Sequence, residues 1–238
     1  MHASKARWFF TGLSATFALS AFAGEITGIV TFEGKPPVMK PIQMDSDPGC
    51  KTHGGGPVLQ DWLVLGEGQT VANVIVAVIA GLPEGKAYPI PQDAVSLSQQ
   101  GCTYTPHILA IRAGQPVKIL NPDKILHNIK PLPKVNPAWN KSMPQQRVEM
   151  TEVFKKAEPV FEIKCNVHAW MHSYCAVFDH PFFDVTEKDG RFCIGGLDPG
   201  DYEIRIWHER LGEQTAKVTV PAEGGVEANF TLRRGGPE

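Results

Sequence analysis

The chain has 238 residues, with 23 basic and 25 acidic side chains and a formal net charge of −2. Binding to nucleic acid needs a positive surface that neutralises phosphates, so we expect none here. The length suffices for one large β domain or for two smaller ones.

The first 23 residues have the features of a secretory signal peptide. Lys5 and Arg7 give a positive start, Trp8 to Phe22 is mostly apolar, and Ala21-Phe22-Ala23 fits a cleavage site. We expect cleavage after Ala23 and a periplasmic location; losing Lys5 and Arg7 would take the net charge from −2 to −4. The apolar run is short and interrupted, whereas a membrane span needs about 20 apolar residues. No stable membrane insertion is therefore expected.

Alternating apolar and polar residues at 24–33 predict a strand, and residues 34–69 form an irregular extension. Residues 70–80 are almost continuously apolar and β-branched, which predicts a strand covered on both faces. A Pro- and Asn-rich stretch at 131–144 could carry a lid or a short helix. Further strands are expected at 108–112, 117–121, 148–154, 160–165 and 174–178, and another is opened by residues 127–129.

A second unit begins near Asp184. Lys188-Asp189-Gly190 and Leu197-Asp198-Pro199-Gly200 are turn signals, and alternating strands are expected near 202–208, 216–220 and 226–232. No helical periodicity is evident outside the signal peptide. The sequence thus predicts an all-β protein made of two sandwiches packed in tandem.

Five cysteines follow the signal peptide: Cys50, Cys102, Cys165, Cys175 and Cys193. In an oxidising compartment cysteines tend to pair. Two disulfides and one metal thiolate would use all five. We favour Cys50–Cys102 and Cys175–Cys193, although spacing alone cannot fix the pairing and buried free thiols are the alternative.

The most informative stretch is Cys165-Asn166-Val167-His168-Ala169-Trp170-Met171. It follows a strand in which Phe161, Ile163 and Cys165 share one face, so the thiol should point inward. His127, which opens an earlier strand, could supply a second imidazole, and Asn128 could rigidify the loop. One Cys, two His and a weakly bound Met form the ligand set of a mononuclear blue-copper centre. The candidate metal ligands are His127, Cys165, His168 and Met171.

Other polar residues offer alternatives. His172 could replace Met171, giving one thiolate and three imidazoles suited to zinc or to another copper geometry. His107 is expected to be structural, and Asp123 and Glu162 to be solvated. We expect the imidazole edge of His168 to be exposed and to pass electrons.

The segments 117–121, 126–129 and 161–171 resemble the cupredoxins, the blue copper proteins of the plastocyanin/azurin type. The resemblance covers roughly residues 70–183 and implies a Greek-key cupredoxin sandwich with one type 1 copper, held by His127, Cys165, His168 and Met171. Residues 190–208 resemble, more weakly, a carboxypeptidase regulatory-like β-sandwich. The whole arrangement is similar to exported proteins labelled methylamine utilisation proteins.

The residue patterns and these resemblances together predict four segments: a signal peptide at 1–23, an N-terminal strand and loop extension at 24–69, a cupredoxin domain at 70–183 and a small β-sandwich at 184–234. The expected function is that of a periplasmic single-electron carrier cycling between Cu(I) and Cu(II), with a cytochrome or oxidoreductase as redox partner. The alternatives are copper storage or delivery without redox turnover, and a metal-free adhesion or scaffold module. We expect no enzymatic activity, because the chain lacks the His-x-His pairs of multicopper oxidases.

Overall fold

The computed structural model describes residues 24–44, 47–51, 57–144 and 149–235. The expected signal peptide, 1–23, lies outside them. Four β-sheets dominate the described part of the chain, and its two short helices are α1 (Pro48–Lys51) and the 3-10 turn η1 (Glu67–Gln69). The predicted all-β class is confirmed. Among the described residues, no helix is long and apolar enough to cross a membrane.

The first sandwich consists of two facing sheets, with strand orders β5-β11-β10-β7-β8 and β4-β3-β6-β9. Its core contains Leu97, Ile111, Ile119 and Ile163, which are almost fully buried. The strands are β3 (Val95–Gln100), β4 (Thr103–Thr105), β5 (Ile108–Arg112), β6 (Pro116–Leu120), β7 (His127–Pro131), β8 (Lys141–Met143), β9 (Glu149–Val153), β10 (Glu158–Lys164) and β11 (His172–Phe178).

The second sandwich has one sheet with order β12-β2-β14-β15 and another in which β1 lies between β13 and β16 and also pairs with β17. The core between these sheets includes Ile26, Leu197, Ile204 and Ile206. The strands are β1 (Gly24–Glu33), β2 (Ile75–Ala80), β12 (Phe183–Val185), β13 (Arg191–Leu197), β14 (Gly200–His208), β15 (Gly212–Val220), β16 (Gly225–Glu227) and β17 (Phe230–Arg233).

Strand pairing corrects the predicted division of the chain at two points. β1 is not part of an extension: it pairs with β13, β16 and β17 of the second sandwich. Likewise, β2 pairs with β12 and β14 rather than with strands of the first sandwich. The strands that pair with β1 and β2 lie more than 100 residues away in the sequence. The first sandwich is therefore inserted between β2 and β12 of the second.

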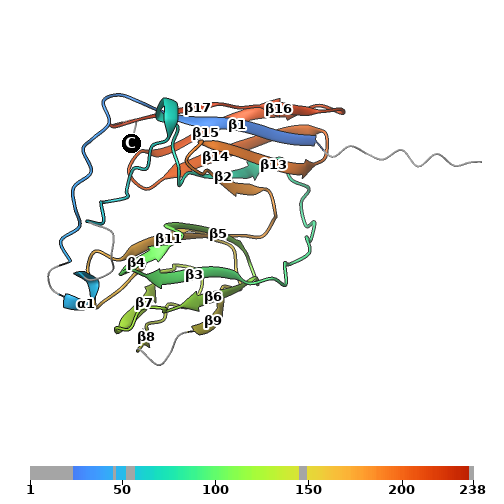
Figure 1. The fold of residues 1–238 in the computed structure, drawn as a ribbon. Coiled ribbons are helices and arrows are strands. Elements are labelled where there is room, and N and C mark those ends of the chain that lie inside the picture. The colour runs from blue at the N-terminus through green and yellow to red at the C-terminus, as the bar shows by residue number, and fades with distance from the viewer. Residues whose placement is uncertain (1–23, 45–46, 52–56, 145–148, 236–238) are drawn as a thin grey trace, which may run out of the picture.

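The strand predicted at 70–80 is observed as β2 over 75–80, and it is buried on both faces at residues 75–78, whereas Ile79 and Ala80 are exposed. Val76 and Val78 point into the core of the second sandwich. Ile75, on the opposite face of β2, packs against Ile108 and Ala176 of the first sandwich. The four sheets are therefore stacked in layers (Figure 1).

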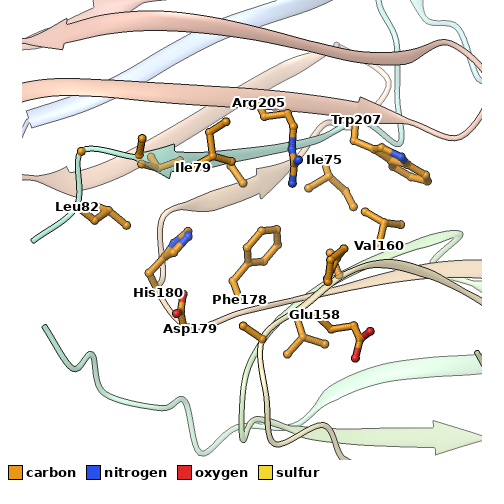
Figure 2. Close-up of a pocket in the computed structure, with 18 residues that line it drawn as sticks. Ile75, Ile79, Leu82, Glu158, Val160, Phe178, Asp179, His180, Arg205 and Trp207 are labelled. Atoms are coloured by element: carbon orange, nitrogen blue, oxygen red, sulfur yellow. The ribbon is translucent and has the colours of Figure 1, made fainter. Parts of the chain in front are cut away.

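A groove of about 550 Å³ lies beside this contact, between the two sandwiches. Figure 2 shows Ile79 and Arg205 on its upper wall and Phe178 and His180 on its lower wall. The two sandwiches thus meet through an apolar contact that is bordered by a groove.

Some sequence predictions were wrong. Residues 131–144 contain the short strand β8 and no helix, and strands β3 and β4 were missed. The predicted Cys175–Cys193 disulfide is absent and both thiols are free. Cys175 is fully buried in the core of the first sandwich, whereas Cys193 is exposed on the outer sheet of the second. The predicted Cys50–Cys102 disulfide is present.

The segment between β1 and β2 crosses from one sandwich to the other and back. In Figure 1 it runs from the end of β1 down to α1, at the edge of the first sandwich, and returns to η1. Cys50 of α1 is joined to Cys102, which follows β3. This disulfide places the residues around α1 over one end of the first sandwich.

At the opposite end of β10 from Cys165, a buried carboxylate holds the loop between β7 and β8. Glu158 accepts hydrogen bonds from the backbone N–H groups of Lys134 (2.6 Å), Val135 (2.8 Å) and Asn136 (2.7 Å). Burial by itself would raise the pKa of Glu158, but these amides outweigh it and lower the pKa below its usual range. The charged form of Glu158 is therefore the one that the fold stabilises.

We predict that Glu158→Gln destabilises the protein by about 2–4 kcal/mol at neutral pH. The substitution replaces one of the two accepting carboxylate oxygens with an NH₂ group, which cannot accept the backbone N–H groups. The folded-state pKa is depressed, so this stabilisation is present above the unfolded pKa and is lost as the pH falls through the folded pKa. Denaturant unfolding at neutral pH and below about pH 4 measures the difference. Glu149→Gln, at an exposed ion pair with Lys118, is the matched control. Equal stability of the Glu158→Gln and control variants at neutral pH would contradict the prediction.

Candidate metal centre

The loop 165–171 joins two paired strands, β10 and β11, whose last and first residues, Lys164 and His172, are partners. The N–H of Cys165 donates to the carbonyl of Met171 (3.1 Å), and the N–H of Met171 donates to the carbonyl of His168 (3.0 Å). These bonds close the loop, so that Cys165 and His168 are held on the same side of it.

Three donor side chains converge at this loop. The Nδ1 atoms of His127 and His168 lie 3.1 Å apart, and Nδ1 of His168 lies 3.8 Å from Sγ of Cys165. One ligand atom from each residue lies within 4.8 Å of the other two, and all three residues are buried. The structure thus brings together three of the four predicted ligands.

These spacings fit a single metal ion. Bonds of about 2.0 Å to nitrogen and about 2.3 Å to sulfur, at trigonal or tetrahedral angles, give N···N separations of about 3.3–3.5 Å and N···S separations of about 3.5–3.7 Å. The observed 3.1 Å and 3.8 Å lie within a few tenths of an ångström of these values. Small rotations of the rings would therefore suffice for a metal to be bound.

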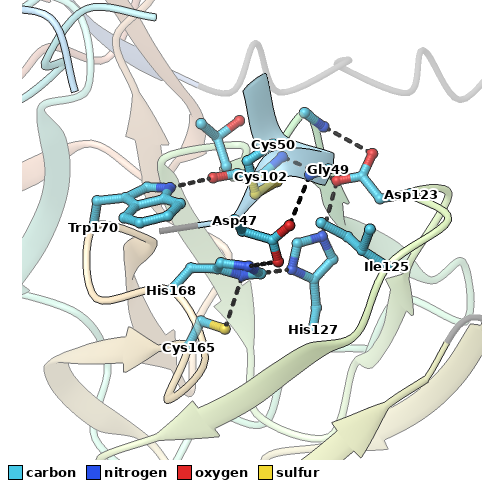
Figure 3. Close-up of a disulfide and its surroundings, with 12 residues drawn as sticks. Asp47, Gly49, Cys50, Cys102, Asp123, Ile125, His127, Cys165, His168 and Trp170 are labelled. Carbon is cyan, nitrogen blue, oxygen red and sulfur yellow. Dashed lines mark hydrogen bonds and ion pairs between the residues drawn. A yellow bond between two sulfur atoms is a disulfide. The ribbon is translucent and has the colours of Figure 1, made fainter. Parts of the chain in front are cut away.

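Each imidazole is oriented by a carboxylate on its other nitrogen. Nε2 of His127 lies 2.8 Å from Oδ2 of Asp123, and Nε2 of His168 lies 3.1 Å from Oδ2 of Asp47 (Figure 3). Such carboxylate–histidine pairs fix the tautomer that leaves Nδ1 available to a metal. Both rings therefore present Nδ1 toward Cys165.

Neither carboxylate was identified from the sequence as part of the site. Asp123 was expected to be solvated, but it is buried and also accepts the backbone N–H groups of Gly101 and Cys102. Its position four residues before His127 was the available signal. Asp47 reaches His168 only because α1 is attached to the first sandwich, and no local pattern indicates such a contact.

The surroundings of Cys165 favour the thiolate. Burial alone would raise the pKa of Cys165, but hydrogen bonding to His127 and to the N–H groups of His168, Asn128 and Val167 outweighs it and lowers the pKa. Burial would likewise lower the pKa of His127, but Asp123 and Cys165 together raise it. The contact between the two side chains therefore favours both the thiolate of Cys165 and a proton on His127.

Asn128 connects the ligand loop to the neighbouring strand, as expected. Its side-chain oxygen accepts the N–H of Asn166 (3.0 Å), and its amide group donates to Oδ1 of Asn140 and to the carbonyl of Lys141 (3.2 Å). The loop is therefore fixed on both sides of Cys165.

The expectation that His168 has an exposed edge was wrong. The residue is 1% exposed, because Asp47 and the disulfide-bonded α1 lie over it. The half-buried ring of Trp170 packs beside His168 at a centroid distance of 5.1 Å and donates its N–H to the carbonyl of Cys102 (3.0 Å). The donor set is therefore closed off from solvent (Figure 3).

The remaining candidates divide clearly. Met171 is buried in the same core cluster as Cys165. His172 does not join the three donors: its ligand atoms group with Asp61 and His107 instead. Cys50 and Cys102 lie near His168, but their sulfurs form the disulfide and supply no thiolate.

No protein-family model and no curated protein sequence matches the chain. Similar solved structures include a Cu-containing nitrite reductase from Thermus scotoductus (TM-score 0.33, 17% identity, covering 42% of this chain and 25% of that one). A purple cupredoxin from Nitrosopumilus maritimus (0.30, 20%, 35% and 99%) and amicyanin from Paracoccus versutus (0.32, 20%, 43% and 97%) are also similar. Identities and TM-scores this low do not assign the chain to a family.

We predict that Cys50→Ser/Cys102→Ser lowers stability by about 4 kcal/mol, the loop-closure entropy for a cross-link spanning 52 residues. Loss of the cross-link should also expose His168, because Asp47 is then no longer held over it. Denaturant unfolding measures the first effect and hydrogen exchange of the 165–171 loop the second. Cys193→Ser, which removes an exposed free thiol, is the control and should change neither. Unchanged exchange in the double variant would show that α1 stays in place without the disulfide.

We also predict that His127→Gln raises the pKa of Cys165, since the largest interaction favouring the thiolate is removed. Ultraviolet absorbance of the thiolate, followed against pH in metal-free protein, should rise at higher pH in the variant than in the wild type. Subtracting the same titration of Cys165→Ser removes the signals of Cys175 and Cys193. Superimposable curves for wild type and His127→Gln would contradict the proposed pairing.

Proposed function

We propose that this chain binds one copper ion through His127, Cys165 and His168, with Met171 as a weak fourth ligand, and carries single electrons. The observation that carries the proposal is the convergence of two Nδ1 atoms and one sulfur at 3.1 Å and 3.8 Å, with each opposite ring nitrogen held by a carboxylate. Two imidazoles and a thiolate in a trigonal arrangement with a weak thioether are the donors of a blue-copper site.

Copper bound there would supply a one-electron change between Cu(I) and Cu(II). The protein contributes a donor set that is already assembled: Asp123 and Asp47 hold the rings, and Asn128 fixes the loop that carries Cys165. Because these contacts fix the rings and the loop, little rearrangement should accompany a change of oxidation state. That property suits electron transfer.

Burial favours electron transfer over storage or delivery of copper. His127, His168 and Cys165 are 0%, 1% and 4% exposed, so a metal cannot be exchanged without displacing the α1 segment. The same enclosure leaves little room for a substrate next to the metal. We therefore propose a carrier rather than an enzyme.

Electrons need a route from the enclosed site to a partner. Trp170 packs against His168 and is half-buried, and the exposed apolar side chains of Leu126 and Val167 directly precede the two histidine ligands. We propose that this rim contacts a redox partner such as a cytochrome or oxidoreductase. The signal-peptide pattern and the Cys50–Cys102 disulfide both support a periplasmic location.

Purified protein loaded with Cu(II) is expected to show an intense visible thiolate-to-copper absorption and a reversible redox couple. Cys165→Ser should abolish the absorption, and Met171→Leu should keep it while shifting the potential, since the axial ligand tunes it. Asp123→Asn should weaken copper binding about 10–100-fold by releasing His127. Asp198→Asn, at an exposed ion pair, is the matched control.

Two outcomes would replace the proposal. Colourless protein that takes up and readily exchanges Cu(I) would indicate storage or delivery. Failure to bind copper in either oxidation state would leave a metal-free pair of sandwiches.

A further inference from the structure

A second group of metal-binding side chains lies where the two sandwiches meet, and the proposed copper site does not use it. Its members come from four separate segments of the chain. Asp61 lies in the segment returning from α1, His107 directly before β5, His172 at the start of β11, and Glu209 in the turn between β14 and β15.

The distances bring these side chains to one place. Oδ2 of Asp61 lies 3.3 Å from Nδ1 of His107, and Glu209 Oε1 is hydrogen-bonded to Nε2 of the same ring. One ligand atom from each of Asp61, His107 and His172 lies within 4.8 Å of the other two. Oε2 of Glu209 lies 3.9 Å from Nε2 of His172.

Two atoms of this group face each other: Nε2 of His172 and Oε2 of Glu209. Nδ1 of His172 lies 3.0 Å from the carbonyl oxygen of Trp170, so this nitrogen carries a proton, and Nε2 presents a lone pair in the neutral form of the ring. The Glu209 side chain is 2% exposed, and its Oε2 has no hydrogen-bond partner within the described part of the chain. A cation bound near these atoms would offset the buried negative charge of Glu209.

His107 is oriented as a metal ligand would be. Glu209 holds Nε2, which is the carboxylate–histidine arrangement found around bound metals. The opposite nitrogen faces Asp61 at 3.3 Å, close to the separation of about 3.3–3.5 Å between two ligands that share one zinc ion.

We propose that Asp61, His107 and His172, with Glu209 holding the far nitrogen of His107, form a site for a divalent transition-metal ion of the zinc type, distinct from the copper site. Two imidazoles and one carboxylate are donors that zinc accepts. Two negative charges would balance the ion, and the neighbouring Arg210, 3.8 Å from Glu209 Oε2, is largely exposed and solvated.

The site is reachable from solvent. The side chains of Asp61 and His172 are 43% and 29% exposed, and both line a cavity of about 310 Å³ together with Trp62, Trp170 and Arg210. A bound ion would link the first sandwich, the second sandwich and the segment between β1 and β2. It would therefore act as a clamp between them.

The alternative for the same geometry is a purely ionic contact. Burial would lower the pKa of His107, but hydrogen bonds to Asp61 and Glu209 outweigh it and raise the pKa to about 9. A protonated His107 would then hold both carboxylates without a metal. The two possibilities differ in whether zinc is bound.

The experiment uses Cys165→Ser as background, which disables the copper site, after treatment with a chelator and dialysis against Zn²⁺. We expect one zinc per chain by elemental analysis and native mass spectrometry. Adding Asp61→Asn and His172→Gln should abolish this zinc, with a loss of affinity of about 100-fold or more, and adding Glu209→Gln should weaken it about 10–100-fold. Adding Asp198→Asn is the matched control and should leave the zinc in place.

Zinc should also raise the unfolding midpoint of the Cys165→Ser protein, since it binds only the folded arrangement. If the variants with changed ligands fail to fold, Co²⁺ is added to Cys165→Ser instead. Visible absorption of a bound cobalt ion without a thiolate band would support the site. Absence of bound zinc and cobalt in folded Cys165→Ser would overturn the proposal, as would unchanged zinc binding after Asp61→Asn and His172→Gln. Neither result depends on the blue absorption of the wild type.

Discussion

The architecture depends on strand β2, which must be covered on both faces. Residues 75–78 of this strand are buried on both faces, and the two faces belong to different cores. Val76 and Val78 complete the second sandwich while Ile75 contacts Ile108 and Ala176 of the first. The two sandwiches are therefore parts of one stack, and the residues at their junction have fixed neighbours.

The candidate metal centre follows a second constraint, the orientation of imidazole rings. A ring held at Nε2 by a carboxylate can offer only Nδ1, and both His127 and His168 are held in this way. The two carboxylates arrive by different means: Asp123 from the loop before β7, and Asp47 from a segment attached by the Cys50–Cys102 disulfide. The same rule applies to His107 and Glu209 at the sandwich junction.

Much of the fold and the three converging donor side chains could be predicted because their signals are local. The alternation in β1, the apolar run of β2 and the spacing of Cys165 and His168 depend on neighbouring residues only. The partners of β1 could not be predicted, since they lie up to 200 residues away. Asp47 was missed for the same reason, being 121 residues from His168.

The strand pattern argues against the predicted Cys175–Cys193 disulfide. Phe192 and Ile194 are buried, so the alternation of β13 turns Cys193 outward, whereas Cys175 points into the core of the first sandwich. Counting cysteines suggested a pair, but the strand period argued against it. The strand face on which a cysteine lies is therefore more informative here than whether the number of cysteines is odd or even.

The insertion of one sandwich within the other has a consequence for the order in which the chain acquires structure. Synthesis delivers β1 and β2 first, yet the strands that pair with them begin at residue 183. The inserted sandwich is continuous in sequence and can mature as soon as it has emerged, because all its strands lie between residues 95 and 178. Until the residues after 182 have followed, the apolar side chains of β2 lack part of their packing contacts. The chain is therefore most prone to misassociation during this interval.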